Sequence, residues 1–300
     1  MKRAAAALVL LLLCAGRDAR GDGFGASAEM RIGAATAPFF TEPIAEVESE
    51  LTQARSMILV AWFGIRPRVI VGGRWPAAPS LVKQPAGSYV DEKAFASPEL
   101  FVEDPAALRA SLGDLAVRAG VRFAVGLPLA QHGPSATLAR NQTLAISDAL
   151  DGWRNPELYT PGVLPFTLSA RGQLARPGSR WRVDAALELP VLVRVHDASL
   201  PHEARTRAVG FVPHAEIGGA LALARWVSVE LSSHVAVHAP APVAPVRDVG
   251  RSGAAHLGIE PRVTFALTPR LELVTSYTAA IAGPLRDTYS FAIGLAYRRE

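Results

Sequence analysis

Ionisable side chains recur at alternate positions of several apolar runs, and they form two groups along the chain. The polar positions of the first-half runs hold a single acid, Glu29, and several arginines. These arginines are Arg31, Arg66, Arg68, Arg74, Arg118, Arg122 and Arg171. The polar positions of the second-half runs hold a single arginine, Arg262, and several acids and histidines. These acids and histidines are His214, Glu216, Glu230, His234, His256, Glu260 and Glu272. Such side chains can bind a metal ion, act as general acids and bases, or select ions along a water-filled passage.

Metal binding and catalysis receive less support from the spacing than ion selection does. The histidines and glutamates of the second half are spaced as on any polar strand face, where they more often bond to each other or to arginines than to a metal. The pairs His196-Asp197 and His202-Glu203 are the local candidates for acid–base work, and we interpret them as solvated loop residues. The sequence contains no glycine-rich phosphate loop. We therefore expect no enzyme activity, no metal site and no cofactor.

The element that has to position these residues is a two-faced β-strand. In Leu115–Leu129 every odd position is apolar, and the even positions carry Arg118 and Arg122 among small residues. This period of two is that of a strand, and the run is about twice the length of the ~5 to 6 residues typical of globular proteins. A long strand with one apolar and one charged face fits a wall between lipid and water.

The same alternation recurs in ten runs. They are residues 24–34, 57–75, 115–129, 166–174, 181–196, 209–221, 227–237, 257–267, 271–281 and 289–297. Their apolar faces carry no Asp, Glu, Lys or Arg, as lipid contact requires, because a charge near the bilayer midplane costs ~2 to 4 kcal/mol. A soluble β-sandwich or lipocalin-like barrel would alternate equally well. Length separates the two, since most runs reach the ~9 to 11 residues of a tilted membrane strand.

The N-terminus has the pattern of a secretory signal peptide. Met1-Lys2-Arg3 precedes an unbroken small and apolar run, Ala4–Ala15, so we assign residues 1–21 to the signal and 22–300 to the barrel. Cys14, the sole cysteine, would leave with the signal, and the mature chain would have no disulfide. The net charge is +4 without a Lys/Arg-rich run, which argues against nucleic acid as a partner.

The last run resembles a known closing element. Thr288–Tyr297 alternates aromatic and small residues and ends on an aromatic, and so resembles the C-terminal strand of Gram-negative outer-membrane β-barrel proteins. The resemblance implies an all-β, antiparallel, up-and-down transmembrane barrel in the outer membrane. It also implies lipid and the barrel-insertion machinery as partners. The His-x-Ser element of barrel phospholipases and deacylases is absent.

The connections bear on the number of strands. Long loops are expected at 35–56, 76–114, 130–164 and 239–254, alternating with tight turns that would face the periplasm. Trp75, Trp181 and Trp226 would then lie near the periplasmic edge as an aromatic girdle. With ten strands, the connection 76–114 would fall on the periplasmic side, where it is long for a turn. Either an insert lies there, in which Asp104-Pro105 would open a short helix at Ala106–Leu112, or two further strands lie in 36–56 and 77–113, which would make twelve.

Two functions remain open from the distribution of charge, and an outer-membrane hydrolase is a third alternative that the sequence supports least. Because consecutive strands are neighbours, the arginines would line one wall of the lumen and the acids and histidines the opposite wall. With water between the walls, the protein would be a narrow channel or transporter for small molecules. With the charges joined in salt bridges, it would be a closed structural or adhesive barrel acting through its external loops. A barrel of about ten strands is narrow enough for its side chains to fill.

Overall fold

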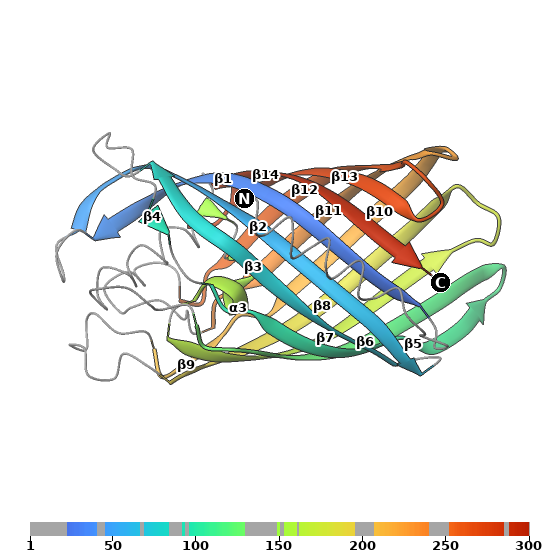
Figure 1. The fold of residues 1–300 in the computed structure, drawn as a ribbon, viewed down its shortest axis with the longest axis horizontal. Helices are drawn as coiled ribbons and strands as arrows, with labels where there is room; N and C mark the ends of the chain where they lie inside the picture. The colour runs from blue at the N-terminus through green and yellow to red at the C-terminus, as the bar shows by residue number, and fades with distance from the viewer. Residues whose placement is uncertain are drawn as a thin grey trace.

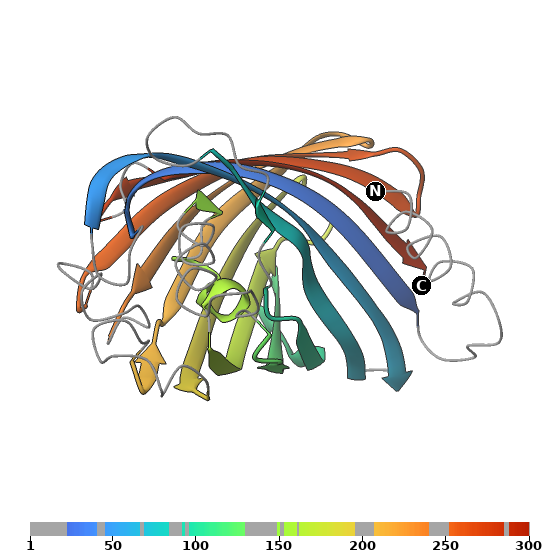
Figure 2. The same ribbon diagram turned by 60° about the vertical axis from the view of Figure 1, so that its left-hand side comes forward.

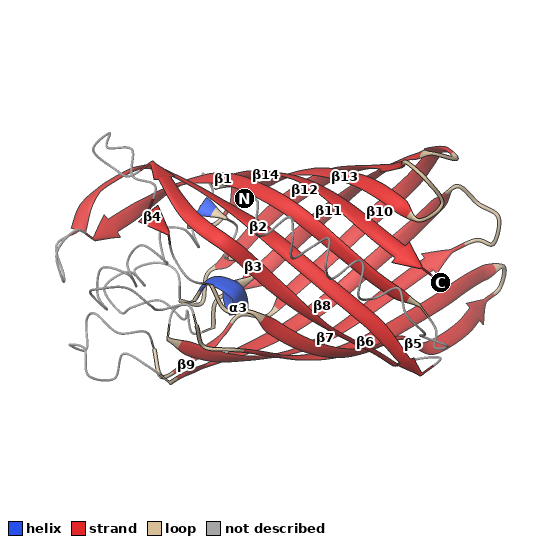
Figure 3. Ribbon diagram, in the orientation of Figure 1, coloured by secondary structure: helices blue, strands red, loops and turns tan. Residues whose placement is uncertain are grey.

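The computed structural model describes most of the predicted barrel. Described are residues 23–40, 46–66, 69–83, 92–93, 96–129, 149–150, 153–160, 162–195, 207–239, 252–284 and 288–299. The predicted signal peptide lies outside these ranges. Nearly all of the regular structure is β (Figure 3). Of the described helices, none has the length and apolar character needed to cross a bilayer.

Twelve long strands and two short ones follow one another along the chain. The long strands are β1 (Phe24–Phe40), β2 (Glu46–Arg66), β3 (Val69–Lys83), β5 (Glu99–Leu112), β6 (Leu115–Gly126), β7 (Val163–Ala175), β8 (Trp181–Arg194), β10 (His214–Ala224), β11 (Val227–Val237), β12 (Ala255–Ala266), β13 (Leu271–Ala282) and β14 (Tyr289–Arg299). The short ones are β4 (Glu92–Lys93), which pairs with β3, and β9 (Val209–Phe211), which pairs with β8. The one described helix is α3 (Pro156–Tyr159).

The long strands close into an antiparallel, up-and-down barrel (Figure 1). Each pairs with its neighbour in sequence, and β1 pairs with β14 from Phe24 opposite Arg299 to Ala34 opposite Tyr289. Pairing of β8 with β10 completes the circle. The predicted fold class is confirmed, and the number of strands is twelve, the larger of the two alternatives.

Two places account for the difference between ten runs and twelve strands. The run 57–75, interpreted as one strand, is a hairpin in which β2 ends at Arg66 and β3 begins at Val69. The range 76–114, expected as a loop, holds the outer part of β3 and all of β5, and the range 35–56 holds parts of β1 and β2. The helix considered at Ala106–Leu112 is strand instead.

The outer surface of the barrel is apolar, as the alternation predicted. Side chains such as Met30, Phe63, Phe123, Leu231 and Phe291 are exposed, whereas Arg31, Glu99, His234 and Glu260 are buried inside. This reversal of the usual soluble pattern is what a lipid-facing wall requires.

The two ends of the barrel differ in their connections. Tight turns join β5 to β6 at 113–114, β10 to β11 at 225–226 and β12 to β13 at 267–270, and we call this the tight-turn end. At the other, long-loop end, the connection from β6 to β7 runs from 127 to 162. Strand β1 begins at Phe24 and strand β14 ends at Arg299, and both residues lie at the tight-turn end.

Candidate functional site: the barrel lumen

Part of the β6–β7 connection lies inside the barrel, and we call residues 149–150 and 153–160 the inward segment. Figure 2 shows α3, which belongs to it, surrounded by strands. Its side chains Leu150, Trp153, Leu158 and Tyr159 are buried almost completely. Because the inward face of a membrane barrel is otherwise polar, this cluster is the main apolar core of the lumen.

The inward segment packs on two sides of the wall near the long-loop end. Leu150, Leu158 and Tyr159 contact Ala35 of β1 and Ala54 of β2. Trp153 contacts Val212, Ala236 and Ala280 on the other side. Glycines leave room for this packing: a Cβ on Gly33 would lie 1.8 Å from the carbonyl oxygen of Ala149, and one on Gly258 would lie 2.7 Å from the Trp153 ring.

On the arginine side, the segment is held by Arg74 of β3. The Arg74 guanidinium donates to Glu157 of α3, to Asn155 Oδ1 at 3.2 Å and to Glu99 Oε2 at 2.6 Å. Arg122 donates to the other oxygen of Glu99 and lies 4.1 Å from the centre of the Phe101 ring. Four charges from β3, β5, β6 and α3 thus form one buried network, with two arginines and two glutamates.

On the acidic side, Arg154 supplies the counter-charge. It donates to Glu260 of β12, and its Nη1 lies 3.3 Å from Thr278 Oγ1 of β13. Glu260 also accepts from Arg262 at 2.7 Å and from Thr278 at 3.2 Å. Since β3 and β12 are five strands apart one way round the barrel and seven the other, the inward segment joins nearly opposite walls.

The buried position of Glu157 changes its acidity. Burial in α3 raises the pKa of Glu157 to about 7, although the neighbouring Arg74 acts in the opposite direction. A carboxyl group with this pKa changes its charge near neutral pH.

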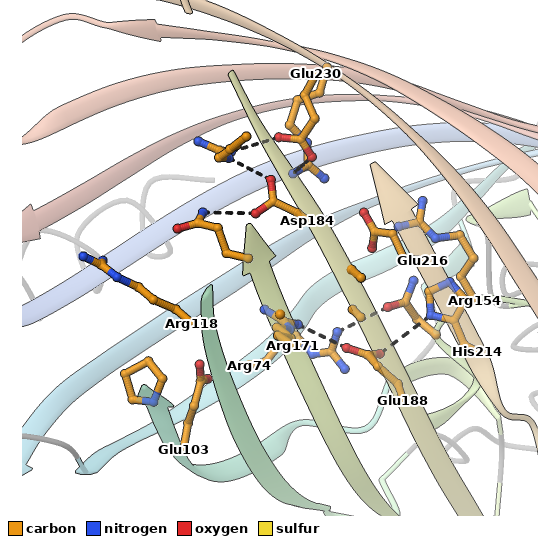
Figure 4. Close-up of a pocket in the computed structure, with 18 of the residues that line it drawn as sticks. Arg74, Glu103, Arg118, Arg154, Arg171, Asp184, Glu188, His214, Glu216 and Glu230 are labelled. Carbon is orange, nitrogen blue, oxygen red and sulfur yellow. Dashed lines mark hydrogen bonds and ion pairs between the residues drawn. The ribbon is translucent and has the colours of Figure 1, made fainter. Parts of the chain in front are cut away.

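Two connected cavities lie in the lumen beside the inward segment. One has a volume of about 640 Å³ and the other about 890 Å³, and they share the lining residues Arg74, Glu103, Pro105, Arg118, Arg171 and Arg298. Arg298 and Gly23 place the larger cavity toward the tight-turn end. Figure 4 shows the smaller cavity, where Arg171 pairs with Glu188 at 3.1 Å.

The predicted arginine wall is only partly brought together. Arg74, Arg118, Arg122 and Arg171 line the cavities, whereas Arg31 is buried and bonded to Glu29 at 3.0 Å. Arg68 and the side chain of Arg66 lie outside the described residues. The unrecognised strand β5 adds Glu99 and Glu103 to this wall, so it is less basic than the sequence indicated.

The predicted acidic and histidine wall lies on β10, β11, β12 and β13 as expected from strand order, and most of its members have partners within it or on the inward segment. His214 Nε2 lies 3.3 Å from His234 Nδ1, and the rings of His238 and His256 are 4.5 Å apart. Arginines of the flanking strands β8 and β14 also pair with this wall: Glu230 pairs with Arg182 at 3.1 Å, and Glu272 lies 3.8 Å from Arg298. Glu216 lies 3.7 Å from His234 Nδ1. Among the described residues no three His, Cys, Asp or Glu side chains are placed to hold a metal ion.

The predicted tryptophan girdle separates into two levels. Trp181 begins β8 and Trp226 lies in the β10–β11 turn, both exposed at the tight-turn end. Trp75 is exposed too, but it lies well inside β3 opposite Leu59, because the turn occurs before Val69 and not at Trp75.

Sequence reasoning missed the residues that fill the lumen: Glu99, Trp153, Arg154 and Glu157. The range 130–164 was interpreted as an external loop. The sequence does carry a signal that part of this range is buried, namely Leu150, Trp153, Leu158 and Tyr159. A loop in water does not need four large apolar and aromatic side chains so close together.

Comparisons with known proteins bear on this geometry. No protein-family model matches the chain, and no curated protein matches it. Among solved structures it is similar to an outer membrane channel from Pseudomonas putida F1, with TM-score 0.58 and 11% identity over 94% of this chain and 96% of that one. The chain has the fold of an outer-membrane β-barrel.

Two further structures are similar at lower scores. The NanC porin gives TM-score 0.48 and 7% identity, covering 90% of this chain and 98% of that one. The translocator domain of autotransporter NalP from Neisseria meningitidis gives TM-score 0.48 and 11% identity, covering 99% of this chain and 95% of that one. The outer-membrane barrel fold supports a location in the outer membrane, while export by a signal peptide stays a prediction.

Proposed function

We propose that this outer-membrane barrel is a narrow channel or transporter for small molecules, and that the inward segment restricts passage through it. The observation that carries the proposal is the pair of tethers, Arg74 to Glu157 and Arg154 to Glu260, beside cavities of several hundred cubic ångströms. Tethers of ionisable groups across the lumen can exchange their partners for water or for an ionic solute.

Outer-membrane barrels have their short turns on the periplasmic side. In that orientation the cavities would lie toward the periplasm. A solute from outside would then pass the inward segment before it reached the arginines. We propose transport and not catalysis as the role of these groups.

The experiment is single-channel conductance of the refolded mature chain in a planar bilayer. Arg154→Gln removes one tether, and we expect a larger mean conductance or more frequent opening. The matched control is Arg176→Gln, which changes an exposed arginine paired with Asp114 at the tight-turn end, outside the lumen. Discrete steps in the wild type that respond to Arg154→Gln and not to Arg176→Gln support the proposal.

The second candidate is a closed structural or adhesive barrel, and the extent of the buried ion-pair network favours it. In that case neither the wild type nor Arg154→Gln would pass current, although both would show the heat-dependent gel mobility of a folded barrel. That outcome would contradict the channel proposal. The loops predicted as external, 35–56, 130–164 and 239–254, lie partly outside the described residues and would be the next regions to delete.

A further inference from the structure

The larger cavity has two chemically different walls. One wall is apolar and is formed by Val60, Trp62, Ile70, Phe101 and Pro105. The other is basic and is formed by Arg74, Arg118, Arg122, Arg171 and Arg298, with Glu103 as the sole acid among its lining residues. Inward-facing valine and tryptophan are unexpected in a lumen that holds only water and ions, because the interior face of such barrels is polar.

Arg118 differs from the other arginines of this cavity. Arg74 and Arg122 bond to Glu99, Arg171 bonds to Glu188, and Arg298 lies 3.8 Å from Glu272. Among the described residues no carboxylate lies within ion-pair distance of Arg118, and in Figure 4 no dashed line reaches it. Its guanidinium is exposed to the cavity and keeps its donors available.

A second arginine stands directly across from it. Arg109 of β5 is the Cα partner of Arg118 of β6, and both lie on the lumen face because Leu108 beside Arg109 is exposed to lipid. Like charges that face each other across a strand pair are destabilising. An anion placed between two guanidinium groups would remove that repulsion and accept bidentate hydrogen bonds.

We propose that this cavity binds an amphipathic organic anion, a carboxylate attached to an aromatic or aliphatic body. The carboxylate would lie at Arg118 with Arg109 beside it, and the apolar body would lie against Trp62, Val60 and Ile70. The volume of about 890 Å³ lies within the range of small-molecule sites, roughly 300 to 1,000 Å³. The proposal deepens the proposed function by naming its solute class, and its test is kept separate from passage.

The test is calorimetric binding to the refolded mature chain in zwitterionic detergent micelles, where no passage is required. Three probes separate the two walls: phenylacetate carries both features, phenylacetamide lacks the charge, and acetate lacks the apolar body. We expect phenylacetate to bind more tightly than either of the others. Arg118→Gln should lower the affinity for phenylacetate roughly tenfold, which corresponds to the loss of one charge-assisted hydrogen bond. The affinity for phenylacetamide should stay unchanged.

Two more variants complete the design. Trp62→Gln should lower the affinities for phenylacetate and phenylacetamide alike and leave the affinity for acetate unchanged. Arg176→Gln, which lies outside the cavity, should change none of them. If Arg118→Gln does not fold, as judged by heat-dependent gel mobility, Arg109→Gln takes its place with the same expected direction.

The proposal is overturned if phenylacetate does not bind, if it binds no better than acetate and phenylacetamide, or if the arginine variant leaves its affinity unchanged. Binding in micelles without current in bilayers would sustain this site and contradict the channel. Current in bilayers without phenylacetate binding would do the reverse.

Discussion

Arg118 and Arg122 lie on the same face of β6 but in different surroundings. Arg122 is largely buried, bonds to Glu99 and lies over the Phe101 ring. Arg118 is exposed to the cavity and has no carboxylate partner among the described residues. The two arginines that the sequence makes equivalent therefore have separate roles, one in holding the wall and one facing the solute space.

Replacing each by glutamine should separate these roles. Arg122→Gln removes one of the two cations from buried Glu99, so we expect a loss of about 1.5 to 3 kcal/mol in the free energy of unfolding. Arg118→Gln should stay within about 0.5 kcal/mol of the wild type. Unfolding in guanidinium chloride, followed by tryptophan fluorescence, measures both, and equal losses would contradict the assignment.

Glu157 should make the inward segment sensitive to pH. Burial raises the pKa of Glu157 in the docked segment from 4.5 to about 7 despite the neighbouring Arg74, so docking favours the protonated carboxyl, to which Arg74 can still donate. This contribution to docking is full below pH 4.5 and is lost as pH rises through 7. We expect conductance to increase between pH 5 and pH 8. Glu157→Gln, which stays uncharged, should remove the increase. A conductance that falls with pH, or a variant that keeps the wild-type profile, would refute this.

At the scale of the element, the inward segment depends on the absence of a side chain at one position of β1. A Cβ at Gly33 would lie 1.8 Å from the carbonyl oxygen of Ala149, so Gly33→Ala should displace the segment while the strand itself accepts alanine. We expect faster protease cleavage within the β6–β7 connection and a larger conductance. Gly219→Ala is the control, because its Cβ would come no closer than 4.0 Å to any atom. Equal cleavage of both variants would contradict the predicted role of Gly33.

The strand elements were predictable from the sequence where alternation was uninterrupted, and the exceptions have physical causes. In 57–75 the lipid-facing residues are odd-numbered on both sides of the β2–β3 turn, as in Phe63 and Val71, so a hairpin keeps the alternation of a single strand. In β5 the register shifts between Asp104 and Leu108, where Pro105 interrupts the ladder. That shift hides the pattern and made the stretch resemble a helix start.

The candidate site was less predictable than the wall. Strand order correctly brought His214, His234 and Glu260 together, because neighbouring runs become neighbouring strands. The partners that decide the electrostatics, Arg154 and Glu157, come from a connection far along the chain from the strands they contact. Alternation carries no information about such long-range docking.

At the scale of the whole molecule, the two walls are not two opposite sheets of uncompensated charge. Each is largely neutralised by partners from β5, β8 or the inward segment, which leaves a modest excess of arginine in the cavities. The smaller cavity is lined by seven arginines and five carboxylates, and the larger by five arginines and one carboxylate. An ion that entered this space would meet a net positive field.

We therefore expect an open channel to prefer anions at low ionic strength. The preference, read as the reversal potential in a salt gradient, should weaken toward 1 M salt, where the screening length falls from about 10 Å at 0.1 M to about 3 Å. Arg118→Glu changes the local charge by two units at an unpaired position and should move the reversal potential toward cations. Arg176→Glu, at the exposed tight turn, should move it much less. A wild-type channel that prefers cations at low salt would show that the acids of β8, β10 and β11, and not the arginines, set the field along the path.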